Sequence, residues 1–368
     1  MKKNFLINYI CEVNYPNSSA YGIHVLKMCD AFVTQGCVVN LIVPHLGIKT
    51  HKLTKNYNIK NKINFLSIFK KKKVINLLSR ILFSLQILSN KYINDNNCLF
   101  VSRSVLFAII ASLFQKKIIL EVHHELSGFT KYFYYFLNKI GLIQNLRYIF
   151  IHKNLIKIFN PLKNRYLCLD DAVDAHDFIF RKPVKKIKKT CVYVGSFYRG
   201  KGVELIFQLA KKLKNINFHL YGDKKFLSVP SYSKNVKVFN FINYKDIPKV
   251  LSKYDVALMP YGNWVSGRLE NINLVKSMSP LKMFDYLASS NIIIASNLRV
   301  YSHILKNNYN SILLNNSKLN LWVKWINKIF KYPKKFNHLK EGALKTANKH
   351  TWIIRSKKII VFANKEFF

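Results

Sequence analysis

Short apolar runs alternate with segments of helical periodicity along most of the chain, and this pattern occurs twice. Such runs are typical of buried parallel strands, and the segments between them are typical of crossover helices. The alternation predicts an α/β fold with helices on both faces of parallel sheets. The expected strands are 5–10, 38–43, 99–101, 118–122 and 148–151 in the first series, and 191–194, 218–221, 236–239, 256–259, 292–295 and 312–314 in the second.

A basic segment separates the two series. Residues 181–189 are mostly Lys and Arg and include Pro183, which is typical of a linker. We therefore expect two Rossmann-like domains, 1–182 and 183–350, which the 368 residues suffice to build. Ligands bind beyond the carboxyl ends of parallel strands, so the expected site is a cleft between the domains.

The charge balance is strongly basic, with 60 Lys and Arg against 17 Asp and Glu and a formal net charge of +43. Clustered positive charge is typical of nucleic-acid binding, and also of attraction to anionic lipid. A third explanation is a genome rich in A and T, because lysine codons are A/T-rich and such a genome encodes many lysines without any binding role. Because no nucleic-acid-binding module is recognisable, we expect no nucleic-acid partner and favour an anionic membrane surface.

The cysteines and the N-terminal residues bear on location. None of the six cysteines forms a CxxC pair, which argues against zinc and for a reducing cytoplasm. The apolar run at 5–11 is interrupted by Asn8 and predicts a strand rather than a signal peptide. The sequence contains no run of 18 apolar residues, so we expect no membrane span. We expect a cytoplasmic protein, with peripheral attachment to the inner face of the membrane left open.

One amphipathic helix is ambiguous. It is predicted over 74–93, after the basic run Lys70 to Lys73. It either faces the core or lies on a membrane surface. The aromatic run at 132–136 leaves the same two alternatives, interface or core.

The segment Ser279–Ala288 predicts a helix start. Ser279 suits the N-cap, and Pro280 suits the first helical position. The N–H groups of Leu281 and Lys282 and the helix dipole then form a phosphate site, to which Lys282 adds a charge. Asp285 is placed to accept hydrogen bonds from sugar hydroxyls. The alternative is a plain capped helix whose Lys282 and Asp285 face water.

A glycine-rich loop, 195–202, follows the strand at 191–194 and precedes a helical segment at 203–213. Glycines let a backbone approach a ligand closely, and Lys201 is placed to reach a diphosphate. The loop matches neither common nucleotide-binding motif, so by itself it also fits a tight strand-to-helix turn.

Together these segments resemble family-4 glycosyltransferases, which are retaining enzymes with the two-Rossmann GT-B fold. The similar segments are 195–206 and 279–296 for the donor side, 18–44 for the acceptor-side opening, 171–174 for a "DGVD" element, and 351–364 for a last helix that returns to the first domain. Residues 50–190 match least well.

The resemblance implies roles for several donor-side residues. Lys201 stands where the family contacts the donor diphosphate, and Asp285 where it holds the ribose. The family usually has Arg at the place of Ser196, so one phosphate contact is absent or comes from Arg199 or Lys282. It often has Glu at the place of Ser277, where the residue touches the transferred sugar, so the resemblance does not assign the donor sugar. The donor-binding set is Gly195, Ser196, Lys201, Ser279, Leu281, Lys282 and Asp285.

The first domain carries the expected catalytic residue. His123 and His124 follow the strand at 118–122 and resemble the family's strand-end histidine, which approaches the donor sugar. Successive side chains along a strand point to opposite faces, so only one of the two histidines points into the site. The resemblance favours His123 over His124 and Glu125 as the catalytic residue. A purely structural histidine is the alternative. Gly22 and Arg103 are assigned to the acceptor side, Arg103 for an acidic acceptor or else as a surface residue.

We expect a retaining glycosyltransferase that uses no metal or cofactor. It moves a sugar from a nucleotide sugar to a membrane-associated glycolipid or polysaccharide, as in lipopolysaccharide or capsule synthesis. The alternatives are a nucleic-acid-binding protein, another GT-B enzyme such as an epimerase or phosphorylase, and a donor-binding paralogue inactivated at Ser196 and Ser277.

Overall fold

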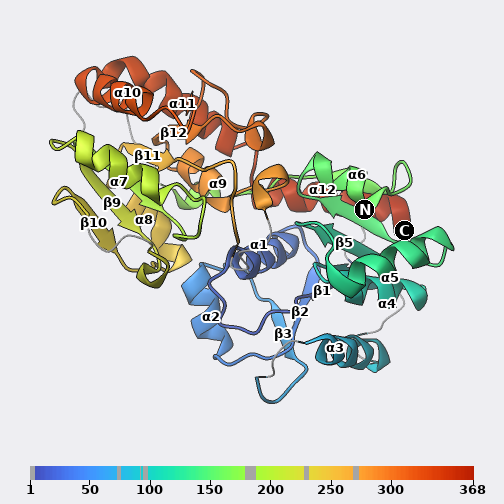
Figure 1. Cartoon of the computed structure of the whole chain (residues 1–368). Coiled ribbons are helices and arrows are strands. Elements are labelled where there is room, and N and C mark those ends of the chain that lie inside the picture. The colour runs from blue at the N-terminus through green and yellow to red at the C-terminus, as the bar shows by residue number, and fades with distance from the viewer. Residues whose placement is uncertain are drawn as a thin grey trace. The chain divides into compact units, whose positions relative to one another are not determined.

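The chain forms two compact units, Met1–Asp170 with Trp352–Phe368, and Asp171–Thr351. The computed structural model describes residues 5–72, 76–91, 93, 98–178, 188–227, 232–267 and 273–368. Each unit is built on one parallel sheet, as the alternating pattern predicted (Figure 1). The expected boundary at 182/183 and Pro183 lie outside the described residues, and residues 171–178 belong to the second unit.

The first unit has a seven-stranded sheet in the order β3-β2-β1-β4-β5-β6-β7. The order reverses between β1 and β4, and such switch points are where α/β sheets bind ligands. The strands are β1 (Leu6–Ile10), β2 (Val38–Val43), β3 (Asn64–Ser67), β4 (Cys98–Ser102), β5 (Ile118–Val122), β6 (Arg147–Phe150) and β7 (Tyr166–Cys168). The two edge strands, β3 and β7, were not predicted, because their partly exposed residues form no apolar run.

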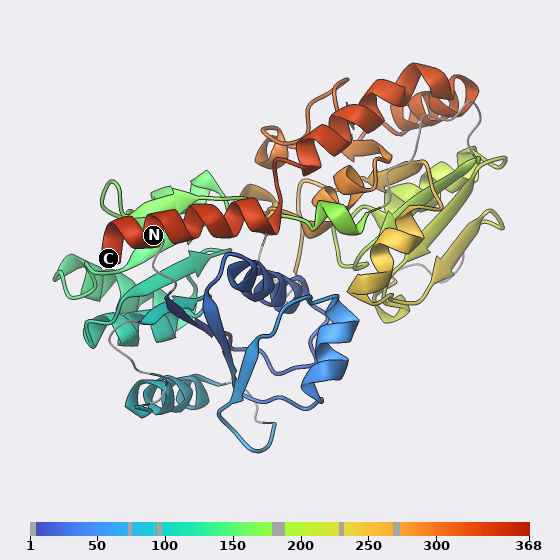
Figure 2. The same ribbon diagram turned by 180° about the vertical axis from the view of Figure 1, so that it is seen from behind.

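Two layers of helices cover this sheet. The helices are α1 (Ala20–Thr34), α2 (Thr50–Tyr57), α3 (Leu77–Ser89), α4 (Val105–Leu113), α5 (Gly128–Lys139), α6 (Lys153–Phe159) and α12 (Trp352–Phe367). The layer of α3 to α6 packs over Phe100, Leu120 and Phe150. Because side chains alternate along a strand, Glu121 of β5 points to the opposite face, where α1 and α12 pack together (Figure 2).

The second unit has a six-stranded sheet in the order β10-β9-β8-β11-β12-β13, which reverses between β8 and β11. The strands are β8 (Thr190–Val194), β9 (Asn217–Tyr221), β10 (Val236–Phe239), β11 (Val256–Met259), β12 (Ile292–Ser296) and β13 (Ile312–Leu314). The helices are α7 (Val203–Lys212), α8 (Ile247–Leu251), α9 (Leu281–Ala288), α10 (Leu319–Lys331) and α11 (Asn337–Ala347). Every strand predicted from an apolar run is present, with ends shifted by a residue at most.

The predicted helix at 74–93 is the shorter α3, and positions 73–75 lie outside the described residues. It buries Phe83, Ile87 and Leu88, whereas most of the apolar positions that marked it in the sequence are exposed. No helix within the described residues is both long and apolar enough to span a bilayer.

Candidate functional site

The glycine-rich loop of the second unit leaves β8 at the switch point of its sheet. Gly200 and Gly202 have φ angles of 78° and 81°, in the left-handed region that favours glycine. A Cβ atom on Gly200 would overlap the carbonyl oxygen of Trp264, and one on Gly202 would overlap that of Pro260. The loop therefore lies directly on the backbone that follows β11, which accounts for these two glycines by packing alone.

Two lysines converge at this switch point. Lys201 ends the loop and Lys282 lies in the first turn of α9, and their Nζ atoms are 4.9 and 5.3 Å from the centroid of the Tyr261 ring. Lys282 also lies over the Tyr193 ring, with its Nζ 3.7 Å from the centroid. The Lys282 Nζ is buried and has no hydrogen-bond acceptor among the residues that the structure describes. Aromatic faces stabilise such a cation only in part.

Burial weakens the charge of both lysines, and the charge of Lys201 further weakens that of Lys282. Burial lowers the pKa of Lys201 to about 8. Burial also lowers the pKa of Lys282 well below its ordinary value, the charge of Lys201 lowers it further, and Asp285 opposes the shift. A bound anion would reverse both effects, because it supplies the missing opposite charge. The pair is therefore suited to a phosphate or diphosphate.

Gly195 completes the surroundings of Lys282. A Cβ atom at Gly195, which has a φ of 147°, would lie 2.5 Å from the Lys282 Nζ. A side chain at this position would thus displace the ammonium group. The neighbouring Ser196 accepts a hydrogen bond on its carbonyl oxygen from the Tyr193 hydroxyl, at 2.7 Å.

The prediction of Ser279 as N-cap is wrong. The helix α9 begins at Leu281, and Pro280 is its N-cap, with an extended ψ of 123°. The Ser279 hydroxyl instead accepts a hydrogen bond from the N–H of Asp171 at 3.0 Å. No described side chain caps α9, so the N–H groups at Leu281 and Lys282 keep their capacity to bind an anion.

The alternative in which Lys282 and Asp285 face water is also wrong. Asp285 is only 4% exposed, and its Oδ1 lies 3.5 Å from the Tyr244 hydroxyl. Ser277, at the place of the family's first glutamate, is equally buried. The structure thus brings Gly195, Lys201, Lys282 and the start of α9 together, whereas Ser279 serves the fold.

In the first unit, Glu121 is the centre of a buried polar cluster. Its carboxylate lies 2.8 Å from the His24 Nε2 and accepts a hydrogen bond from the Tyr9 hydroxyl at 2.6 Å. Arg355 of α12 forms an ion pair with the same oxygen that His24 contacts. Burial raises the pKa of Glu121, but Arg355 and His24 outweigh it and hold the pKa well below its usual range.

His123 points into this cluster and His124 points away, as strand alternation predicts. The Nε2 of His123 is 3.3 Å from Glu121 Oε1, and its side chain is 11% exposed. His124 is exposed, and its Nδ1 lies 3.0 Å from the backbone carbonyl oxygen of Glu125. Burial and the nearby charge of Arg103 lower the pKa of His123 to about 3, so its imidazole is neutral at physiological pH.

His24, Glu121 and His123 offer ligand atoms within 4.8 Å of one another. They do not fit a metal ion well, because the Glu121 oxygen nearest to both histidines already pairs with the Arg355 guanidinium. A metal would have to displace Arg355 and leave its charge buried. We therefore derive no chemical step through a metal.

Arg103 and Gly22 have different environments. Arg103 directly follows β4, and its guanidinium lies 4.0 Å from the centroid of the Tyr21 ring. Within the described ranges it forms no ion pair or hydrogen bond. Gly22 lies in the first turn of α1, where its N–H donates to the Ser19 hydroxyl and a Cβ would lie 2.7 Å from the Asn17 carbonyl oxygen. Local packing alone therefore requires this glycine.

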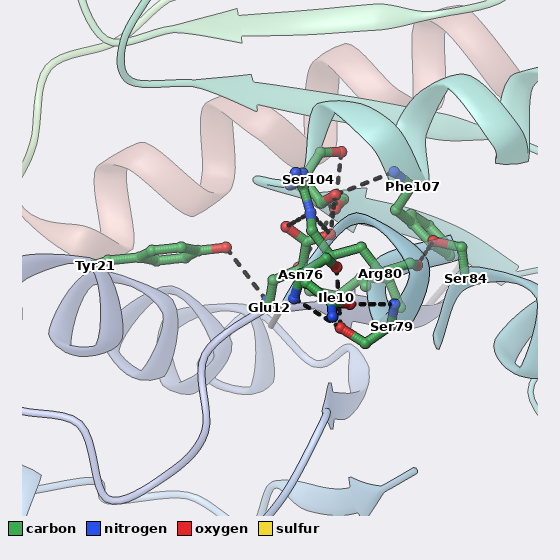
Figure 3. A network of polar contacts seen from close by, with 10 residues as sticks. Ile10, Glu12, Tyr21, Asn76, Ser79, Arg80, Ser84, Ser104 and Phe107 are labelled. Atoms are coloured by element: carbon green, nitrogen blue, oxygen red, sulfur yellow. Dashed lines mark hydrogen bonds and ion pairs between the residues drawn. The ribbon is translucent and has the colours of Figure 1, made fainter. Parts of the chain in front are cut away.

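A second polar network fixes the switch point of the first sheet (Figure 3). Glu12, just beyond β1, accepts hydrogen bonds from Arg80 of α3 at 3.0 Å and from the Ser104 hydroxyl at 2.6 Å. The Glu12 N–H donates to the Tyr21 hydroxyl at 3.4 Å. These contacts join the ends of β1 and β4 to the helices beside them.

Sequence reasoning missed most of these supporting residues, namely Tyr9, Glu12, His24, Glu121, Arg355, Tyr193, Tyr244 and Tyr261. One signal was available, since an acidic residue inside the apolar strand 118–122 must find a buried partner.

Comparison with known proteins matches the second unit to a family. Residues 175–346 match the family model described as "Glycosyl transferases group 1". The chain is a glycosyltransferase. No curated protein sequence matches it.

Solved structures show that this glycosyltransferase has the GT-B fold. A glycosyltransferase from Rickettsia africae superposes with a TM-score of 0.73 at 13% identity, with 99% of each chain covered. Anabaena Alr3699/HepE in complex with UDP and glucose gives 0.68 at 11% identity, covering 98% of this chain and 100% of that one. WaaG, a glycosyltransferase involved in lipopolysaccharide biosynthesis, superposes with a TM-score of 0.63 at 10% identity, and the match covers 96% of this chain and 98% of WaaG. The predicted fold class is therefore confirmed.

Proposed function

We propose that this glycosyltransferase is a retaining enzyme whose nucleotide-sugar donor is held through its diphosphate by Lys201, Lys282 and the start of α9. The observation that carries the proposal is the Lys282 ammonium group, buried without a hydrogen-bond acceptor among the described residues and next to a second lysine. Buried unpaired charge destabilises a fold, so a site that concentrates it is suited to an anionic ligand.

These groups would act on the leaving nucleotide. Negative charge grows on the diphosphate as the bond to the sugar breaks, and fixed cations and N–H groups stabilise that charge without reorganising. The chain's own groups thus supply the stabilisation, and no metal ion or cofactor takes part in the proposal. Asp285 would accept hydrogen bonds from the ribose hydroxyls. Retention of configuration rests on the resemblance to family-4 enzymes.

His123 and Arg103 would serve the other substrates. A neutral imidazole can exchange hydrogen bonds with a sugar hydroxyl at physiological pH, and Glu121 fixes its orientation. Arg103, which has no acidic partner in the described part of the chain, would bind a phosphate or carboxylate of the acceptor. We propose a membrane-associated glycolipid or polysaccharide as acceptor, in cell-surface glycan synthesis at the cytoplasmic face.

Calorimetric titration with UDP, GDP, ADP and CMP tests the donor site. One nucleoside diphosphate should bind, with UDP the first choice because HepE has been solved with it. Lys201→Ala and Lys282→Met should each weaken binding by about 10- to 100-fold, since one charge-assisted hydrogen bond is worth about 1.5–3 kcal/mol.

Lys211→Ala is the matched control, because Lys211 is exposed at the far end of α7. It should leave the affinity unchanged. Equal affinity in wild type and in both site variants would sink the proposal. Turnover with the bound donor, followed by the anomeric proton signals of the product, tests retention separately.

A further inference from the structure

Helix α5 presents an apolar stripe to solvent. Phe129, Tyr132, Phe136 and Ile140 recur three or four residues apart, and are 63%, 73%, 60% and 50% exposed. This spacing places them on one side of the helix. The other side is anchored in the core by Tyr134 and Leu137. The aromatic run at 132–136 is thus divided between core and surface.

Helix α3 repeats this arrangement. Leu77, Leu78, Leu82 and Leu85 are 44%, 66%, 44% and 43% exposed, whereas Phe83, Ile87 and Leu88 are buried on the other side. A helix that only covered the core would carry polar residues at the exposed positions. Large exposed apolar patches mark interaction sites in soluble domains.

Helix α4 connects these two stripes. It packs against both α3 and α5, and Figure 1 shows it between them. At its end, Leu113 and Phe114 are 39% and 57% exposed. We call the outward faces of α3 and α5, with this end of α4, the α3–α5 surface. All three helices lie on the same face of the sheet, because they share one core cluster.

The charge of the α3–α5 surface has a single sign. Residues 76–91, 98–118 and 126–169 contain no Asp or Glu. Exposed lysines flank the apolar stripes, among them Lys72 and Lys91 around α3 and Lys131 and Lys139 on α5. A basic amphipathic face of this kind with Phe, Tyr and Leu at its centre is typical of helices that lie in a membrane interface.

We propose that the α3–α5 surface docks onto an anionic lipid bilayer. The apolar stripes would enter the boundary between headgroups and acyl chains, and the lysines would meet lipid phosphates. A second copy of the chain is a poorer occupant, because its acid-free face would bring lysines against lysines. The docking rests on the proposed function only in that it brings the enzyme to a membrane-borne acceptor.

Vesicle co-sedimentation of the full chain tests the docking. The protein should bind vesicles made of equal amounts of phosphatidylcholine and phosphatidylglycerol. Its affinity for vesicles of pure phosphatidylcholine should be lower by about tenfold or more. Replacing Phe129, Tyr132 and Phe136 together by Ser should lower binding to the mixed vesicles by more than about tenfold, because less apolar surface can insert. Replacing Lys131 and Lys139 by Ser should lower it less and reduce its sensitivity to salt.

Matched changes in the second unit serve as controls. Phe241, Tyr309 and Tyr332 are also exposed aromatic residues, at 48%, 46% and 42%, and replacing all three by Ser should leave vesicle binding unchanged. Replacing Lys324 and Lys331 on α10 by Ser is the matched control for the change of Lys131 and Lys139, and it should leave vesicle binding unchanged. An unaltered circular dichroism spectrum and urea denaturation curve show that the aromatic triple variant is folded, and Lys201→Ala should still bind vesicles, so the two proposals fail separately.

Three results would overturn the docking proposal. One is equal binding to neutral and anionic vesicles. Another is full binding by the folded triple variant at Phe129, Tyr132 and Phe136. The third is a dimer in light scattering that this variant abolishes while vesicle binding persists, which would assign the surface to a second copy.

Discussion

Both units bury charged side chains at the carboxyl edge of their sheets, but they treat these charges differently. In the first unit, the Glu121 carboxylate contacts Tyr9, His24 and Arg355, so its negative charge has partners on both oxygens. In the second, Lys201 and Lys282 both lie near the Tyr261 ring, and the charge of Lys201 disfavours the charge of Lys282. A satisfied buried charge holds neighbouring groups in place, whereas an unsatisfied one weakens the free protein and favours a bound anion.

The largest effect is expected at Glu121. Glu121→Ala leaves the Arg355 guanidinium buried without its partner, and should lower the free energy of unfolding by about 3–5 kcal/mol. Urea denaturation followed by circular dichroism measures this. Glu125→Ala, at an exposed position on the same segment, should change stability by less than about 0.5 kcal/mol. Equal effects of the two substitutions would show that the cluster around Glu121 is not a structural unit.

A change at Lys282 is expected to raise the free energy of unfolding instead of lowering it. Lys282→Met removes a buried ammonium group that lacks an acceptor and keeps a side chain of similar length, so the ligand-free protein should gain about 1–2 kcal/mol. The same denaturation experiment, without nucleotide, measures the gain. A loss of stability in this variant would mean that the free protein already satisfies the charge of Lys282, and the contrast between the two units would disappear.

The smallest effect concerns pH. Because the pKa of Lys201 is about 8 in the folded protein and higher when unfolded, the unfolded chain binds more protons above pH 8. Stability without nucleotide should therefore rise between pH 7.5 and 8.5, by less than about 1 kcal/mol. Nucleotide affinity should fall over the same range, as Lys201 loses its charge. Lys201→Met should flatten both trends, and parallel trends in the wild type would contradict the assignment.

The sequence predicted the parts of this contrast that depend on local pattern. Apolar runs located the strands, and the positions of Lys201 and Lys282 after a strand and at a helix start suggested an anion site. Alternation correctly separated His123 from His124. The start of α9 was misplaced by one residue, because Ser279 bonds a distant backbone group at Asp171 instead of the helix.

The cluster around Glu121 could not be predicted from local pattern. Its partners come from β1, α1 and α12, and Arg355 is 234 positions away in the chain. No periodicity or motif relates such residues, since only the folded topology brings their helices to one face of β5. The rings of Tyr193 and Tyr261 were missed for the same reason.

The position of α12 has a consequence for biosynthesis. Arg355 and Trp352 belong to the first unit, yet a ribosome makes them only after the whole second unit. While the second unit is translated, the Glu121 carboxylate lacks the Arg355 guanidinium, and the face of α1 that α12 covers stays open. The first unit therefore matures last although its strands are made first. A recombinant version of that unit alone needs residues 352–368 joined after residue 170 by a linker, rather than a simple truncation.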